Sequence, residues 1–130
     1  MMKNEDSVIS GALRSRMNDL RQTGEGEYAC SMDFDPAFRG FEGHFEGNPI
    51  VPGVCLIEAA RTAAETVLEK NLSTRRVAQC RFRRPIKAGE CAEVKIKIAE
   101  TEPGTWQIQA DVRVESAVCA QLRLKAEESL

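Results

Sequence analysis

The sequence has little histidine and no pattern typical of a disulfide or zinc site. Its 130 residues include one histidine, His44, and five cysteines, none of which form a Cys-x-x-Cys pair. A single histidine excludes metal sites that need two histidines from one chain, and it excludes catalysis by a histidine pair within one chain. An odd number of widely spaced cysteines argues against a disulfide framework. We therefore expect no metal, and mostly buried thiols in a reducing compartment.

Long apolar runs and a large excess of one charge are also absent. No stretch approaches the roughly 18 apolar residues of a membrane-spanning helix, and residues 1–10 lack the apolar core of a signal peptide. We therefore expect a cytoplasmic protein without a membrane span. Lysine and arginine total 18 against 20 aspartate and glutamate, for a net charge of -2. This balance argues against a nucleic-acid-binding protein, so any basic binding site must be local.

The length and composition are those of one globular domain. The chain is 42% hydrophobic and 29% charged, and its length suits one hydrophobic core better than two. We expect a single domain over residues 1–130. Within it, residues 1–24 should form an N-terminal helix and linker, and residues 125–130 a frayed tail.

Hydrophobic spacing predicts two helices. Apolar residues recur every three or four positions over residues 5–20, which is typical of an amphipathic helix. Residues 53–70 follow a proline and are rich in alanine, leucine and glutamate, which predicts a second helix. Because apolar residues cover more than half of its circumference, this second helix should be enclosed by other structure.

Alternating patterns predict the strands. Residues 27–34 should form a strand with one buried face made of Tyr28, Cys30, Met32 and Phe34. Further strands are predicted at residues 77–82, 92–101, 106–114 and 118–124. Turn signals between the last three predict an antiparallel meander. Together these patterns predict an α+β fold, in which a curved antiparallel sheet of about five strands wraps around a central helix.

Residues suited to chemistry are concentrated in a glycine- and proline-rich loop at residues 35–53 and in the helix that follows. His44 lies in this loop, where prolines restrict the backbone and glycines allow a ligand to approach closely. Gly53 falls at the helix N-terminus, where unpaired amides favour an oxyanion. Glu58 follows in an apolar stretch, where it could donate a proton. A base, an oxyanion site and an acid are the groups that expel a β-hydroxyl next to a carbonyl.

The segment HFEGNPIVPGVCLIEA, residues 44–59, resembles the signature of FabZ-type 3-hydroxyacyl-(acyl carrier protein) dehydratases of the hotdog-fold superfamily. The positions that match are His44, Phe45, Gly47, Pro49, Pro52, Gly53, Val54, Glu58 and Ala59. The segment RFRRPI, residues 81–86, and the later Gly89 are also similar to this family. The resemblance implies a hotdog fold and a homodimer in which two hotdog domains form a double hotdog. This dimer would occur by itself or as one part of a trimer of dimers.

The resemblance also implies a role for each matched residue. His44 would remove the α-proton of a β-hydroxyacyl thioester, and Glu58 of the partner subunit would protonate the departing hydroxyl. The Gly53 amide would hold the thioester carbonyl, and the Ile50 carbonyl would orient the imidazole. The remaining substrate-binding positions are Phe45 and Val54. The substrate would be carried on the phosphopantetheine of an acyl carrier protein, with no other cofactor, and the product would be the trans-2-enoyl thioester.

Two features of the helix depart from the family pattern. Thr62 stands where the family has glutamine, and Arg61 is unusual on a helix that should line an acyl tunnel. On the helical wheel Glu58 and Arg61 share a polar stripe, so a plain i, i+3 salt bridge is an alternative to a catalytic Glu58.

A cluster of basic residues lies at the end of the strand predicted over residues 77–82 and just beyond it. It could receive the carrier protein or the phosphate of phosphopantetheine, or it could protect a strand edge from aggregation. Its members are Arg81, Arg83, Arg84 and Lys87.

Two further functions are compatible with a hotdog fold. The chain could be a hotdog acyl thioesterase, which would release a free thiol from an acyl thioester. It could also be a non-catalytic module that binds acyl chains or a carrier protein.

Overall fold

The computed structural model describes residues 4–42, 47 and 49–129. Its helices are α1 (Asn4–Ser15), the short 3-10 helix η1 (Arg39–Phe41) and α2 (Gly53–Leu68). Its strands are β1 (Met17–Gly24), β2 (Glu27–Phe34), β3 (Leu72–Phe82), β4 (Glu90–Glu102), β5 (Thr105–Val114) and β6 (Ala117–Glu128). No helix in this described part of the chain is long and apolar enough to cross a membrane.

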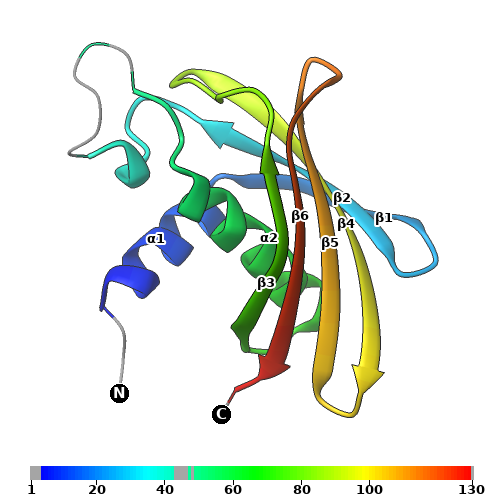
Figure 1. The fold of residues 1–130 in the computed structure, drawn as a ribbon. Helices are drawn as coiled ribbons and strands as arrows, with labels where there is room; N and C mark the ends of the chain where they lie inside the picture. Colours follow the sequence, from blue (N-terminus) through cyan, green and yellow to red (C-terminus); the bar gives the residue numbers. More distant parts are fainter. Residues whose placement is uncertain (1–3, 43–46, 48, 130) are drawn as a thin grey trace.

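All six strands belong to one antiparallel sheet that curves around α2 (Figure 1). The strand order is β1-β2-β4-β5-β6-β3, so β1 and β3 are the edges. The meander predicted for the last three strands is confirmed, because β4 pairs with β5 and β5 with β6. The predicted α+β architecture, a curved sheet around a central helix, is therefore confirmed with one strand more than expected.

The additional strand is β1, which occupies part of the predicted N-terminal helix. The prediction of a helix to residue 20 was wrong, because α1 ends at Ser15 and Met17 pairs with Met32 of β2. Met17 and Leu20 both pack against the core, three positions apart, which is a helical spacing. A bulge between Asn18 and Arg21, with Asp19 at φ 59, supplies the extra residue that places them on one face of a strand.

The C-terminal segment is also ordered where a frayed tail was expected. β6 continues to Glu128, which pairs with Leu72 at the start of β3, and Ala126 is fully buried. The Ser129 amide donates to the Asn71 carbonyl at 2.8 Å. The prediction of fraying from residue 125 was therefore wrong through residue 129, because this segment forms the ladder that holds β3 to the sheet.

Small side chains let the sheet approach α2 closely. Four alanines of the helix are at most 1% exposed: Ala59, Ala60, Ala63 and Ala64. α1 covers another side of α2 (Figure 1) and contributes the fully buried Leu13. The second helix is thus enclosed, as its apolar circumference predicted.

An aromatic cluster fixes the chain between β2 and the loop that precedes α2. The rings of Phe34 and Phe38 meet edge to face at 5.2 Å, and those of Phe38 and Phe41 at 5.4 Å. Gly40 lies so close to Phe38 that a Cβ at this position would be 2.4 Å from the ring. The cluster therefore holds η1 in one position against the core.

The cysteines are free thiols, and three of the five are buried: Cys30, Cys55 and Cys119. Burial raises the pKa of Cys30 and of Cys55 to about 11. Because the thiolate is the reactive form, these two thiols should be inert near neutral pH. The expectation of mostly buried thiols is confirmed, with Cys80 and Cys91 as the exposed exceptions.

Replacing Phe38 should strongly destabilise the fold. Phe38 is 1% exposed, so removing its ring leaves a cavity among the other aromatic rings. Phe38→Ala should therefore lower the free energy of unfolding by about 3–5 kcal/mol. Val8→Ala, at a 42% exposed side chain of α1, is the control and should cost about 1 kcal/mol or less. Urea denaturation of both variants measures the difference, and equal losses would contradict this account of the core.

Candidate active site

His44 and Phe45 lie outside the described residues, but the chain beyond them is anchored. The Val51 amide donates to the Ile86 carbonyl at 2.8 Å, and the Ala88 amide to the Pro49 carbonyl at 3.2 Å. Ile50 forms an isolated bridge with Lys87. The segment that follows β3 therefore fixes the path by which the chain enters α2.

The start of α2 is a close contact between Gly53 and Phe82. A Cβ at Gly53 would lie 2.6 Å from Cζ of Phe82, so only glycine fits under this ring as it stands. No described side chain caps the helix, and helix geometry leaves the amides of its first turn without intrahelical acceptors. The side chains beside these amides are apolar and well exposed, 64% for Val54 and 52% for Phe82. Accessible apolar side chains thus surround the predicted oxyanion position. One of them, Phe82, was not among the predicted substrate-binding residues.

Glu58 lies on the same helix as Gly53, five residues or about 7.5 Å further along the axis. Its side chain is 19% exposed and accepts from Nε of Arg61 at 3.1 Å, through Oε1. Nη2 of Arg61 also donates to Oε1. The i, i+3 salt bridge left open by the sequence is therefore present, and the role of Glu58 as an acid stays a prediction.

Arg61 is the centre of a buried polar network that connects α1, α2 and the start of β3. Nη1 of Arg61 is 2.8 Å from Oε2 of Glu65 and 3.2 Å from the Leu72 carbonyl. Nη2 is 2.8 Å from the Ser10 hydroxyl. Glu65, which is 6% exposed, also accepts from the Leu72 amide at 2.7 Å and forms an ion pair with Arg14. Sequence reasoning missed Ser10 and Arg14, because no local pattern relates them to partners 51 positions away.

Thr62, which stands where the FabZ pattern has glutamine, is fully buried. Its hydroxyl donates to the Ala59 carbonyl of its own helix at 3.1 Å. The hydrogen bonds to Glu58 that the structure describes come instead from the neighbouring Arg61.

The structure divides the four predicted basic residues. Arg81 and Arg83 line a groove of about 490 Å³ on the outer sheet face, together with Arg123, which sequence reasoning did not select. Arg84 instead forms an ion pair with Glu90 at 3.0 Å.

The residues around Glu90 hold the segment after β3. The Lys87 amide donates to Oε1 of Glu90 at 2.8 Å, and this bond, together with that from Arg84, lowers the pKa of the Glu90 carboxyl. The side chain of Lys87 is exposed. Arg84 therefore pairs with a carboxylate, whereas Arg81 and Arg83 lie in an open groove, where Nε of Arg83 donates to Oε1 of Gln121 at 3.0 Å.

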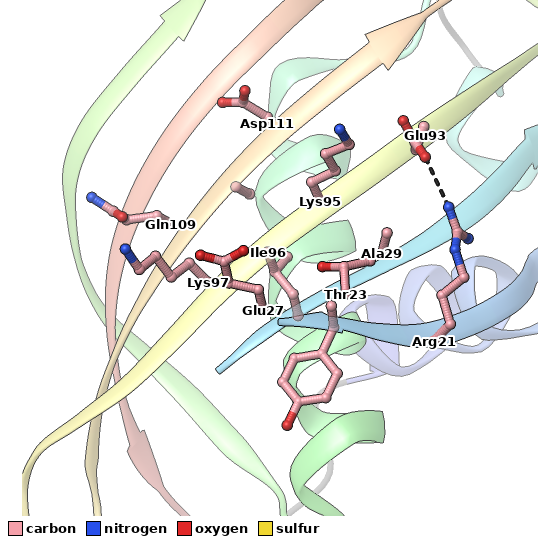
Figure 2. Close-up of a pocket in the computed structure, with 12 residues that line it drawn as sticks. Arg21, Thr23, Glu27, Ala29, Glu93, Lys95, Ile96, Lys97, Gln109 and Asp111 are labelled. Atoms are coloured by element: carbon pink, nitrogen blue, oxygen red, sulfur yellow. Dashed lines mark hydrogen bonds and ion pairs between the residues drawn. The ribbon is translucent and has the colours of Figure 1, made fainter. Parts of the chain in front are cut away.

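A second groove on the outer face, of about 480 Å³, is shown in Figure 2. Arg21 and Glu93 form an ion pair at 3.0 Å on its wall, and Lys95 and Lys97 line it from β4. Gly53 and Glu58 are not among its lining residues. This groove therefore does not mark the predicted site.

The contact between Gly53 and Phe82 predicts an energetic coupling. Gly53→Ala should cost about 1–2 kcal/mol of unfolding free energy, because the new methyl group overpacks against the ring. In a Phe82→Ala background the same change should cost much less. Urea denaturation of the two single variants and the double variant measures the coupling, and strictly additive losses would rule out the contact.

A family model described as ApeI-like, ApeI dehydratase, matches residues 20–123. Curated relatives include two proteins named 3-hydroxyacyl-[acyl-carrier-protein] dehydratase FabZ. The one from Campylobacter concisus (strain 13826) is 28% identical over 99 residues, which cover 66% of this chain and 67% of the relative. The one from Campylobacter fetus subsp. fetus is 29% identical over 118 residues, which cover 81% and 79%.

Solved structures share the fold. A chain of the dehydratase heterocomplex ApeI:P from Xenorhabdus doucetiae has a TM-score of 0.70 and 22% identity, covering 85% of this chain and 96% of that one. A hypothetical thioesterase with coenzyme A from Streptococcus pneumoniae TIGR4 has a TM-score of 0.69 at 9% identity, covering 97% and 95%. These likenesses confirm the hotdog fold. Because the family model spans most of the 130 residues, the chain belongs to the ApeI-like dehydratase family.

Proposed function

We propose that the protein dehydrates a β-hydroxyacyl thioester, carried on the phosphopantetheine of an acyl carrier protein, to the trans-2-enoyl thioester. The observation that carries the proposal is the match to a dehydratase family over residues 20–123. The FabZ names of relatives at 28% and 29% identity agree with a thioester on a carrier protein. The start of α2 at Gly53, with its apolar surround, suits the oxyanion part of this chemistry.

In the proposed reaction, His44 takes the α-proton while the Gly53 amide hydrogen-bonds the thioester oxygen, where negative charge develops. The dipole of α2 adds to this stabilisation. The bond between the β-carbon and its hydroxyl oxygen then breaks, the oxygen takes the proton of Glu58, and water leaves. Electrons from the broken Cα–H bond form the new double bond. The Ile50 carbonyl would orient the imidazole, and Phe45 and Val54 would line the substrate path.

We place the His44 and Glu58 of each site on different chains of a homodimer. β3 is an edge strand that pairs, among the described strands, with β6 alone, and most of its residues are exposed. Large apolar side chains are exposed on β3 and at the start of α2: Val54, Val77 and Phe82. An open edge beside exposed apolar side chains is typical of a surface that a second chain covers.

We assign the groove containing Arg81 and Arg83 to the acidic carrier protein or the phosphate of its prosthetic group. The groove also contains Arg123, so three guanidinium groups line it against one carboxylate, that of Asp111. Such a local excess of positive charge favours an anionic partner even though the chain carries a net charge of -2. Arg84 and Lys87 lie around Glu90 and contribute less to this surface.

The reaction can be tested with 3-hydroxyacyl-(acyl carrier protein) substrates of short and long chain. The protein should increase the absorbance of the enoyl thioester, and His44→Ala and Glu58→Gln should each lower kcat by about 10²-fold or more, because each removes a proton-transferring group. Release of free thiol would indicate a thioesterase. Tight carrier binding without turnover would indicate a binding module, and either outcome would overturn the proposal.

The shared site can be tested by mixing the two inactive variants. Random re-pairing of His44→Ala and Glu58→Gln chains should restore about a quarter of the wild-type activity, since half of the dimers then have one intact site of two. Each variant re-paired with itself is the control. If no activity returns although mass spectrometry detects the mixed dimers, the two residues act within one chain.

A further inference from the structure

We propose that Arg61 is a positioning residue for Glu58. The family pattern does not require an arginine at this position. The inference rests on the proposed function and adds to it a residue that does not touch the substrate. Its starting observation is that two nitrogens of Arg61, Nε and Nη2, donate to the same oxygen of Glu58, Oε1. This arrangement fixes the carboxyl group and leaves Oε2 as the oxygen for the substrate.

The guanidinium itself is held rigidly. It is 12% exposed, and its other described hydrogen bonds go to groups on three different parts of the chain: Ser10 of α1, Glu65 of α2 and the carbonyl of Leu72 in β3. A planar guanidinium with fixed partners on several sides cannot rotate without breaking some of these bonds. The orientation of Glu58 is therefore set by the packing of the domain.

Arg61 also lies where the proposed reaction generates charge. When Glu58 transfers its proton to the departing hydroxyl, negative charge appears on its carboxyl group. Nε of Arg61, 3.1 Å from Oε1, hydrogen-bonds the carboxylate that this transfer leaves. The proton balance is unchanged, because the proton still passes from Glu58 to the leaving oxygen.

The chain offers a matched control in Arg14. This arginine also connects α1 to α2, through an ion pair with Glu65, but its described contacts do not include Glu58. Arg14→Gln therefore weakens the same helix packing without touching the carboxyl group in question. If Arg61 acted only through packing, the loss of kcat in each variant would follow its loss of stability.

The experiment compares Arg61→Gln, Arg61→Lys and Arg14→Gln, using the 3-hydroxybutyryl thioester of N-acetylcysteamine as substrate. Arg61→Gln should lower kcat by about 10²-fold with little change in KM, as expected when a reacting group is misplaced. Arg61→Lys should recover part of the loss, because it keeps one charged donor. Arg14→Gln should lower the melting temperature but reduce kcat much less than Arg61→Gln does. Equal losses of kcat in Arg14→Gln and Arg61→Gln would overturn the inference.

A double-mutant cycle tests whether Arg61 acts through Glu58. In a Glu58→Gln background, Arg61→Gln should lower kcat no further, and an undiminished loss there would overturn the inference. The ¹³C resonance of the Glu58 carboxyl gives a readout without turnover. It should move in Arg61→Gln and not in Arg14→Gln, and an unmoved resonance would overturn the inference. A wild-type protein without dehydratase activity but with this NMR response would refute the proposed function and leave the contact established.

Discussion

The fold depends on the close approach of the curved sheet to α2. The four alanines of the helix, each at most 1% exposed, add little bulk between the helix and the elements packed around it. An interior packed this closely tolerates little change in volume, so each strand must keep its register to present its apolar face. The bulge in β1 meets this requirement for Met17 and Leu20, which both pack against the core.

Enclosure also decides where charge can occur on α2. Glu65 and Arg61 are 6% and 12% exposed, and isolated charges at such depth would be costly. Each is stabilised because it has several partners, including the backbone of Leu72. The network therefore connects the packing of α1 to the residue proposed as the acid. In this protein, the stability of the domain and the geometry of the proposed site share the same hydrogen bonds.

The sequence predicted what depends on local periodicity. The enclosed helix, the strand at residues 27–34 and the terminal meander were correct, because each has an apolar face that repeats within a few residues. β1 was missed because its bulge imitates helical spacing between Met17 and Leu20. In the candidate site, the spacing of Glu58 and Arg61 indicated their salt bridge. The contacts of Ser10 with Arg61 and of Phe82 with Gly53 depend on tertiary packing, which no local pattern records.

The contact between Gly53 and Phe82 has a consequence for the evolution of the family. The phenyl ring occupies the space that a side chain at the start of α2 would need, so the two positions share one volume. A larger residue can replace glycine at position 53 only after a smaller residue has replaced phenylalanine at position 82. The two sites should therefore covary among relatives, and glycine at the helix start should be retained wherever an aromatic residue ends β3.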